Sequence, residues 1–284
     1  MDSITGFKLI MNKQVGIVGY GWVGKSMHRL FPDALIYSHQ KDLEGNQMLW
    51  EGDHNEDLQK EINEKCDVVF VCVPTPCPNE SKLDTTAVEE AVEWLTVDLI
   101  VIRSTMNPGD CDFLTAKYEK NICMQPEYLG ETPNHPLLNT NQPPFMVIGG
   151  DWKNREKLIQ LYATVYNSNI NIKELSNYAA EIVKLTENRA IAWKVMQMHE
   201  LYEVCQAANI PFYTIQQAVY GDDPRFDLWF SFVYPDNLGF HSSKCLKKDP
   251  YAWMAWAESF GYTPKLTRAL VDASKDYDEK RKLN

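Results

Sequence analysis

Three groups of residues have types and spacings suited to chemistry, and the first is a glycine turn. Gly19-Tyr20-Gly21-Trp22-Val23-Gly24 follows the mostly apolar run Gln14 to Val18 and precedes a helix-like stretch. The first glycine permits a tight turn, the second lets the backbone approach a pyrophosphate, and the third lets helix and strand pack closely. The phosphate charge is then favoured at the helix N-terminus. The turn predicts a dinucleotide site, the alternative being a purely structural glycine turn.

The second group is Lys184 and Asn188, which are four residues apart in a segment of helical spacing. Residues at this spacing share one face of a helix. A lysine on an otherwise apolar face either extends its ammonium group to solvent or acts in a site. The pair is therefore a candidate site, with a solvent-directed lysine as the alternative.

The third group surrounds Cys245, which has the lysines Lys244, Lys247 and Lys248 close to it in the sequence. Nearby positive charge lowers the pKa of a thiol and favours the nucleophilic thiolate. A cysteine is otherwise most often a small buried apolar residue. Both readings of Cys245 stay open at this point.

Polar segments that contain proline follow three apolar runs of the N-terminal half. They are Val73-Pro74-Thr75-Pro76, Ser104 to Gly109, and Gln125 to Glu131. Ligands of α/β sheets lie at the carboxyl ends of the strands. Each segment alone is most simply a turn, but three at one edge of a sheet predict a site.

The elements that position these residues follow from the apolar pattern. Short apolar runs alternate with helical stretches such as Thr85 to Leu95, which predicts a doubly wound α/β domain. The runs are Gln14–Val18, Ala34–Tyr37, Asp67–Val73, Leu99–Arg103, Asn121–Met124 and Phe145–Gly149. They are apolar on both faces, as in a buried parallel sheet.

A long helix is predicted after this domain. Residues 177–208 contain no proline or glycine, Ser176 can cap the N-terminus, and Pro211 ends the segment. We therefore expect a Rossmann-type domain over residues 1–175, followed by an all-helical domain over residues 176–284 that is built on the long helix.

Composition narrows the class of protein further. The chain has 284 residues, a formal net charge of −11 and seven cysteines without paired spacing. The acidic balance argues against nucleic-acid binding, and the cysteines argue against a disulfide scaffold or a zinc site. No signal peptide and no membrane-spanning segment is evident. We expect a cytoplasmic protein without a metal.

The order of the motifs resembles the UDP-glucose/GDP-mannose dehydrogenase family. The Val73–Pro76 segment, Ser104–Gly109 and Pro126–Glu131 match VPTP, STxxPG and PEYLGE after the glycine turn. The second half continues the resemblance with an E-x-x-K-x-x-x-N helix, a G-x-D-x-R segment and a segment ending in KD. These lie at Glu181–Asn188, Gly221–Phe226 and Gly239–Asp249.

The resemblance implies oxidation of a nucleotide-sugar 6-hydroxyl to a carboxylate in two NAD-dependent steps. It makes Cys245 the nucleophile. The thiolate would add to the aldehyde left by the first hydride transfer, and the tetrahedral carbon would lose the second hydride to give a thioester for hydrolysis. UDP-glucose is the first substrate candidate.

The resemblance also implies individual roles. Lys184 would stabilise oxyanion charge, Asn188 would hold substrate or water, Asp249 would orient Lys184 or water, Glu131 would act with water as a base, and Thr105 would hold that water. Cofactor contacts are expected from Gly19, Tyr20, Gly21, Trp22, Val23, Gly24, Ser38, Val73, Pro74, Thr75, Ser104, Thr105, Glu131 and Lys248. Substrate contacts are expected from Glu127, Tyr128, Leu129, Lys184, Asn188, Arg225, Gly239 and Phe240. Arg225 resembles an arginine that reaches a neighbouring subunit's substrate, which implies a homodimer through the long helix.

Three departures keep alternatives open. The second strand ends at Ser38 without the carboxylate that binds the ribose of NAD, so NADP stays possible. The glycine pair that family members carry before the cysteine is absent. The family's C-terminal α/β domain, which holds the nucleotide, has no counterpart here, so the chain is naturally short or a partner supplies it. A single-step β-hydroxyacid dehydrogenase using Lys184 and Asn188, or a non-catalytic dinucleotide-binding relative, are the alternatives.

Overall fold

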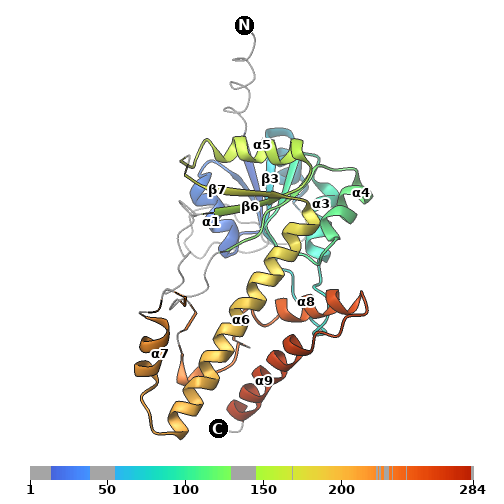
Figure 1. Cartoon of the computed structure of the whole chain (residues 1–284). Helices are drawn as coiled ribbons and strands as arrows, with labels where there is room; N and C mark the ends of the chain where they lie inside the picture. Colours follow the sequence, from blue (N-terminus) through green and yellow to red (C-terminus); the bar gives the residue numbers. More distant parts are fainter. Residues whose placement is uncertain are drawn as a thin grey trace. The chain divides into compact units, whose positions relative to one another are not determined.

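A parallel sheet of five strands dominates the N-terminal part of the computed structural model (Figure 1). The structure describes residues 14–38, 55–128, 145–167, 169–221, 223, 225–226, 230–231, 233–240 and 242–282. The strands are β1 (Gln14–Val18), β2 (Leu35–Tyr37), β3 (Cys66–Val71), β4 (Leu99–Ile102) and β5 (Ile122–Met124). Their spatial order is β2-β1-β3-β4-β5, and every adjacent pair is parallel.

The order of the strands reverses at β1, because the chain passes from β1 to β2 on one side and then returns to β3 on the other. In open α/β sheets, ligands bind outside the carboxyl ends of the strands beside such a reversal. The loops after β1 and β3 begin at that place.

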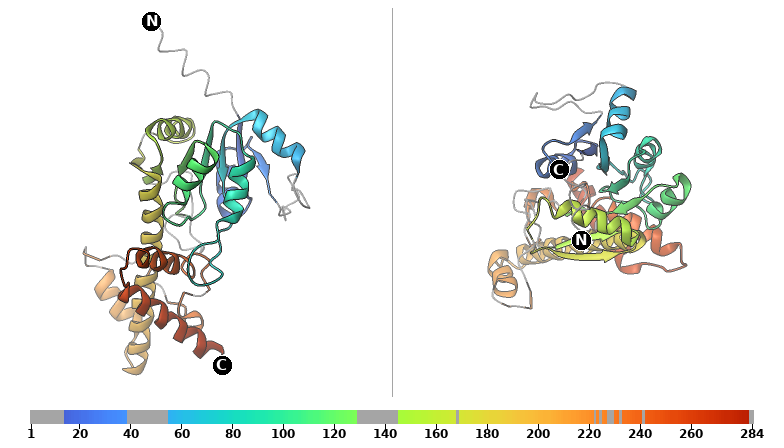
Figure 2. Two further views of the ribbon diagram at one scale, coloured as in Figure 1. Left: turned by 90° about the vertical axis from the view of Figure 1, so that its right-hand side faces the viewer. Right: turned by 90° about the horizontal axis from the view of Figure 1, so that it is seen from above.

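Helices cover both faces of this sheet, as Figure 2 shows from two further directions. Successive side chains of a strand point to opposite faces. Val69 and Val71 of β3 therefore pack into one apolar cluster with helices α2, α3 and α4, whereas Phe70 packs into another with α1 and α5. These helices are α1 (Trp22–Leu30), α2 (Glu56–Lys65), α3 (Thr86–Trp94), α4 (Asp110–Tyr118) and α5 (Trp152–Tyr162). The predicted doubly wound α/β domain is confirmed.

The sixth predicted strand lies in a separate sheet. β6 (Phe145–Gly149) pairs in parallel with β7 (Asn171–Leu175), a strand that the sequence did not predict. The side chains of β7 are exposed or half-buried, so this strand lacks the apolar run that marks the others. The sequence did not predict β7 because its residues form no apolar run.

The long helix predicted over residues 177–208 is observed as α6 (Asn177–Ala207). The Ser176 hydroxyl accepts a hydrogen bond from the Ala179 N–H at 3.2 Å, so Ser176 caps the helix as predicted. The remaining elements are α7 (Phe212–Tyr220), the short 3-10 helix η2 (Pro235–Asn237), α8 (Asp249–Glu258) and α9 (Lys265–Lys282). The second part of the chain is helical, as expected.

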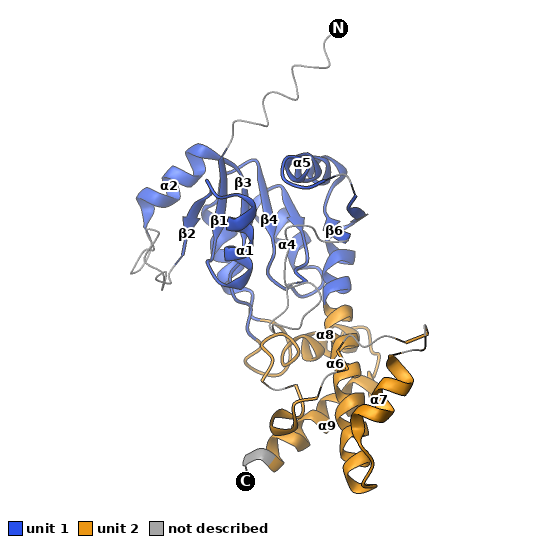
Figure 3. Cartoon of the chain, turned by 90° about the vertical axis from the view of Figure 1, so that its left-hand side faces the viewer, with its two compact units in different colours: residues 1–76, 84–133, 137–184 blue, residues 77–83, 134–136, 185–284 orange. Residues whose placement is uncertain are grey.

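The chain divides into two compact units, which Figure 3 colours separately. Unit 1 comprises residues 1–76, 84–133 and 137–184, and unit 2 comprises residues 77–83, 134–136 and 185–284. Helix α6 contributes its first two turns to unit 1 and its remainder to unit 2. Within the described ranges, no helix has both the length and the apolar character needed to span a membrane.

Candidate active site

The glycine turn after β1 is closed on both sides by backbone. Gly19 has a φ of +92°, and its N–H donates to the carbonyl of Tyr37 at 2.8 Å. A Cβ at Gly19 would lie 2.6 Å from the carbonyl oxygen of Cys72, and one at Gly24 would lie 2.0 Å from the carbonyl oxygen of Gly19. Side chains are therefore excluded at Gly19 and Gly24, as the turn requires.

Space remains open at the middle of the turn. A Cβ placed on Gly21 would meet no atom within 4 Å, and Gly21 caps α1 without a side-chain hydrogen bond. The first turn of α1 contains no acidic residue, and Trp22 is exposed. The Tyr20 hydroxyl is hydrogen-bonded to Nδ1 of His28 at 2.8 Å, and Val23 packs on the apolar cluster of α1. An uncapped helix N-terminus beside open space fits the pyrophosphate of a dinucleotide.

Ser38 follows β2 directly and is buried. It occupies the position where a ribose-binding carboxylate would be expected, as the sequence predicted. The buried hydroxyl offers one donor and acceptor in place of a charge.

The loops after β3 and β4 are joined by a hydrogen bond. The Ser104 hydroxyl donates to the carbonyl of Val73 at 2.6 Å. Thr75 and Thr105 are buried beside these loops, whereas Pro74 is exposed. The structure thus brings the predicted residues of both loops to the carboxyl edge of the sheet.

A buried ion pair holds the segment after β5. The guanidinium of Arg103 contacts the Glu127 carboxylate at 2.8 Å, with both side chains about one-tenth exposed. Arg103 also donates to the carbonyl of Pro126 at 3.5 Å. In the sequence, Arg103 is the last residue of a predicted apolar strand and was given no role of its own. A charged residue that ends such a run is a signal that would have identified it, because buried charges require partners.

Lys184 of α6 reaches the same segment. Its ammonium group donates to the carbonyl of Glu127 and lies 5.5 Å from the centre of the Tyr128 ring. The side chain is buried rather than extended into solvent. The solvent-directed alternative for Lys184 is therefore wrong, and the ammonium group lies at the carboxyl edge of the sheet.

Glu181 was named in the sequence as part of a motif but was given no role. Its side chain is completely buried. Its two carboxylate oxygens accept the N–H groups of Gly109 at 2.6 Å and Cys111 at 2.8 Å. Nothing local in the sequence signals these bonds, since their partners lie about seventy residues away.

In unit 2, Asp249 is the centre of a buried polar group. One carboxylate oxygen accepts a hydrogen bond from the Asn188 side-chain amide, and the other contacts the Lys248 ammonium at 2.7 Å. The Asp249 N–H donates to the carbonyl of Cys245 at 3.0 Å. Cys245 is a reduced, half-buried residue in the turn before α8. Four of the predicted residues are thus brought together in this unit.

The chain before this turn is anchored to α6 and α9. The N–H of Gly239 donates to Nδ1 of His199 at 2.9 Å, and the N–H of Phe240 donates to the Ser274 hydroxyl at 3.0 Å. Burial lowers the pKa of His199 to about 4, so the ring is neutral at pH 7 and can accept this bond. His199 is a second residue whose role the sequence analysis missed.

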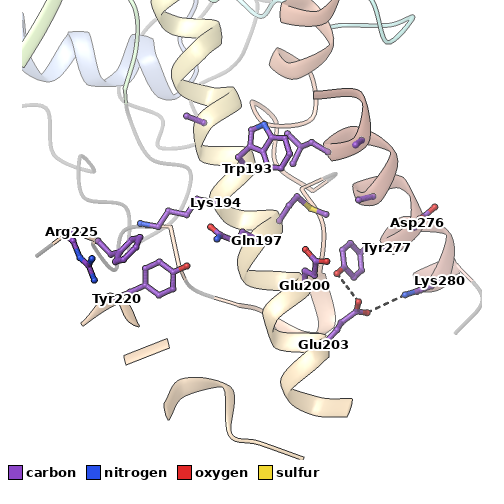
Figure 4. Close-up of a pocket in the computed structure, with 16 residues that line it drawn as sticks. Trp193, Lys194, Gln197, Glu200, Glu203, Tyr220, Arg225, Asp276, Tyr277 and Lys280 are labelled. Atoms are coloured by element: carbon purple, nitrogen blue, oxygen red, sulfur yellow. Dashed lines mark hydrogen bonds and ion pairs between the residues drawn. The ribbon is translucent and has the colours of Figure 1, made fainter. Parts of the chain in front are cut away.

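Unit 2 also contains a groove of about 850 Å³ that is lined by residues of α6, α7 and α9 and by Arg225 and Phe226 (Figure 4). Arg225 and Lys194 lie in one part of it, and Glu203 in another is bonded to Tyr277 and Lys280. Arg225 is exposed, and its guanidinium contacts both oxygens of the Asp223 carboxylate. The polar group around Asp249 does not line this groove.

Two predicted residues, Leu129 and Glu131, lie outside the described residues. In the part of the chain that the structure describes, no group of three or more potential metal ligands occurs among the His, Cys, Asp and Glu side chains. The predicted residues that the structure describes therefore form two separate groups: a cofactor part with Lys184 in unit 1, and Asn188, Cys245 and Asp249 in unit 2.

Comparison with known proteins matches both parts of the chain to one family. Residues 47–168 match the NAD binding domain of the UDP-glucose/GDP-mannose dehydrogenase family, and residues 178–275 match its central domain. The chain is 26% identical to UDP-glucose 6-dehydrogenase of Rickettsia typhi over 220 residues, which covers 74% of this chain and 49% of that protein. It is 33% identical to UDP-N-acetyl-D-mannosamine dehydrogenase of Methanocaldococcus jannaschii over 160 residues, or 52% and 36% of the two proteins.

Solved structures share the fold. A UDP-glucose dehydrogenase from Pyrobaculum islandicum superimposes with a TM-score of 0.73 at 19% identity, over 93% of this chain and 68% of that one. A UDP-D-ManNAc dehydrogenase from Pyrococcus horikoshii gives 0.72 at 18% identity, over 92% and 68%. The chain spans about half the length of the Rickettsia relative that it matches.

Proposed function

Because this chain belongs to the UDP-glucose/GDP-mannose dehydrogenase family, we propose that it oxidises the primary alcohol of a nucleotide sugar with NAD as the hydride acceptor. The match to the family's NAD binding domain supports NAD as the cofactor. The observation that carries the proposal is the burial of Lys184 and Asn188. The Lys184 ammonium group donates to the Glu127 carbonyl, and the Asn188 amide donates to the Asp249 carboxylate.

The glycine turn fits the cofactor. Gly21 leaves space where a side chain would stand, and the N-terminus of α1 beside it has no acidic residue to repel a phosphate. When bound, NAD accepts a hydride from the carbon that is being oxidised. Thr75, Ser104 and Thr105 line the edge of the sheet next to the turn and supply hydroxyl groups for cofactor or water.

Lys184 would stabilise negative charge on the sugar oxygen. A lysine ammonium group has three N–H donors, and one of them is taken by the Glu127 carbonyl. The others can be directed at an alkoxide or oxyanion, whose charge a buried ammonium stabilises more strongly than water does. Asn188, one turn further along α6, would bind a substrate hydroxyl or water.

Cys245 would carry the second oxidation. An aldehyde has no hydride to lose until a nucleophile makes its carbon tetrahedral, and the thiolate can do so. The thiohemiacetal formed in this way would lose its hydride with a second NAD as the acceptor, and the thioester that results would be hydrolysed by water, with Glu131 as the expected base. Asp249 would orient this region, since its amide is bonded to the Cys245 carbonyl and its carboxylate to Asn188.

A homodimer is the second part of the proposal. Arg225 is exposed, and its guanidinium binds the Asp223 carboxylate two residues earlier in the sequence, so a neighbouring subunit can reach it. Light scattering of the purified chain at micromolar concentration tests this part. A dimer is expected, and a monomer at every concentration would contradict it.

The enzyme assay uses the purified chain with NAD and a panel of UDP-glucose, UDP-N-acetylmannosamine and GDP-mannose. Absorbance of reduced nicotinamide should rise with at least one UDP-sugar. A flat response to every nucleotide sugar together with measurable NAD binding would contradict the proposal and favour a non-catalytic dinucleotide-binding protein.

A further inference from the structure

One face of α6 carries four buried polar residues in its first three turns, namely Asn177, Glu181, Lys184 and Asn188. Their spacing of four, three and four residues keeps them on one side of the helix. We call this set the polar face of α6. The proposed reaction gives Glu181 no role, although its side chain is completely buried.

The neighbours of Glu181 on the polar face are bonded to β5 and the segment after it. The Asn177 side chain accepts the N–H of Met124 at 2.8 Å and donates to the carbonyl of Ile122 at 3.2 Å. Lys184 donates to the carbonyl of Glu127, three residues beyond the end of β5. Asn177 and Lys184 therefore set the first turns of α6 against one strand and its extension.

Glu181 binds a different element. Its carboxylate accepts the N–H groups of Gly109 and Cys111, at the N-terminus of α4. Helix N-termini expose N–H groups without intrahelical partners, and α4 has no side-chain cap of its own. Gly109 has a φ of +102°, which turns the backbone into this arrangement. Glu181 thus performs the capping of α4 from another helix.

The same bonds end the loop that carries Thr105. Ser104 holds the start of the loop at the Val73 carbonyl, and the side chain of Asn107 donates to the Asp110 carboxylate at 2.9 Å. Glu181 completes these restraints at Gly109. The Thr105 loop and Lys184 are therefore both tied to one turn of α6.

The surroundings of Glu181 disfavour the charged form of its carboxyl group. It is fully buried, and the titratable groups that face it are Asp110 and the Cys111 thiol of α4. Burial raises the pKa of the Glu181 carboxyl to about 7, against the lowering effect of the two N–H donors. Burying a carboxylate costs free energy unless hydrogen bonds compensate for the lost water. The two N–H groups of α4 provide these bonds, and they tie Glu181 to the loop that carries Thr105.

We propose that Glu181 is a positioning residue that fixes the Thr105 loop relative to Lys184 through its two bonds to the N-terminus of α4. The inference rests on the proposed dehydrogenase function for its effect on turnover. Its structural part, the placement of the Lys184 ammonium group, can be measured without turnover.

The test compares Glu181→Gln and Glu181→Asp with Leu114→Ala, which removes a buried apolar side chain from the same helix α4. Gln keeps the size of the side chain but presents a donor to one of the two N–H groups. We expect kcat to fall by about 10-fold or more in Glu181→Gln, since small displacements of reacting groups have large effects on rate. KM for NAD should change less than kcat does, because the glycine turn is untouched and only the loop with Thr105 is displaced.

The dependence of kcat on pH separates positioning from stability. In the unaltered chain and in Leu114→Ala, kcat should fall as Glu181 is protonated below about pH 7. In Glu181→Gln this limb should be absent. Equal pH profiles for all variants, or a kcat loss in Leu114→Ala as large as in Glu181→Gln at matched thermal stability, would overturn the inference.

Labelling of Lys184 gives the result that does not depend on turnover. Acetylation of lysines under native conditions, followed by peptide mass spectrometry, should modify Lys184 faster in Glu181→Gln than in Leu114→Ala. Unchanged labelling of Lys184 in Glu181→Gln would overturn the inference even in an active enzyme. Faster labelling without any activity in the unaltered chain would support the positioning and contradict the proposed function instead.

Discussion

The polar face of α6 is held in different ways in the two units. In unit 1, the side chains of Asn177, Glu181 and Lys184 bind main-chain groups of strand β5, helix α4 and the segment after β5. In unit 2, the Asn188 side chain binds another side chain, that of Asp249, and the Asp249 carboxylate forms an ion pair with Lys248. The start of α6 is therefore bonded to main-chain groups, whereas Asn188 further along the helix is bonded to a network of side chains.

The difference bears on how the two parts can vary. Main-chain partners are placed by the sheet and survive substitution of the residues that carry them. Side-chain partners are lost with a single substitution, which leaves buried charges unpaired. Unit 1 therefore fixes the position of Lys184, the proposed charge-stabilising group, through main-chain partners. Unit 2 holds the proposed nucleophile Cys245 beside a network of side chains that a single substitution can break.

The largest expected effect follows from replacing Lys184. In Lys184→Met, the loss of the buried ammonium group should lower kcat by about 100- to 1,000-fold, the range for removal of one oxyanion donor. Initial rates with a UDP-sugar measure this, and NAD affinity should be unchanged. Lys194→Met, ten residues further along α6, is the matched control. A loss of less than about 3-fold at Lys184 would remove it from the reaction.

Loss of the side-chain network around Asp249 in unit 2 should leave NAD binding by unit 1 unchanged. Asp249→Ala leaves Lys248 and Asn188 without their buried partner, and unpaired buried charges of this kind cost about 3 to 5 kcal/mol. Chemical denaturation followed by tryptophan fluorescence measures the loss. NAD should still bind, because the glycine turn belongs to unit 1. Loss of NAD binding in the folded variant would contradict the separation of the two parts.

Two buried groups, one in each unit, should contribute to stability with opposite dependences on pH. Glu181 has its pKa raised from 4.5 to about 7, so the folded state keeps a proton that the unfolded state has lost. Its contribution to stability falls as pH rises from 4.5 to 7. His199 has its pKa lowered from 6.5 to about 4, so its contribution falls as pH drops from 6.5 to 4.

Variants isolate these two contributions from the other titrating groups. The unfolding free energy of the unaltered chain minus that of Glu181→Gln should decrease by about 3 kcal/mol between pH 4.5 and 7. The corresponding difference for His199→Gln should increase by a similar amount between pH 4 and 6.5. Denaturant titrations at several pH values measure both. Slopes of the same sign would refute the contrast between these two groups.

A smaller effect is expected from the glycine turn. Gly21→Ala adds a methyl group where the fold has open space, so stability should change by less than about 1 kcal/mol, the difference in helix or turn propensity. The methyl group would lie where the pyrophosphate is expected, and NAD affinity should fall by about 10-fold, which corresponds to about 1.4 kcal/mol. Calorimetric titration with NAD measures it, and unchanged affinity would place the cofactor elsewhere.

The sequence predicted the parts of the fold that have strong local patterns. The glycine turn, the apolar strands, the capping by Ser176 and the length of α6 depend on neighbours in the chain, and all are observed. Strand β7 escaped prediction because it is polar and pairs only with β6 among the described strands.

The candidate site was predictable only where a motif marked it. Lys184, Asn188 and Cys245 stand in such motifs. Glu181 and His199 could not be assigned a role, because a lone charged or imidazole side chain on a helix gives no sign of burial or of a partner far away in the sequence. Arg103 lies between these cases, since its place at the end of an apolar run offered a signal.

The most direct test of the account is the number of reduced nicotinamides formed for each nucleotide sugar consumed. The proposed use of Cys245 predicts two, with a carboxylate product. Cys245→Ser should form at most one, whereas Cys77→Ser, which alters another reduced and half-buried cysteine of unit 2, should still form two. A stoichiometry of one in the unaltered chain, indifferent to Cys245→Ser, would contradict the account and favour a single-step dehydrogenase that uses Lys184 and Asn188.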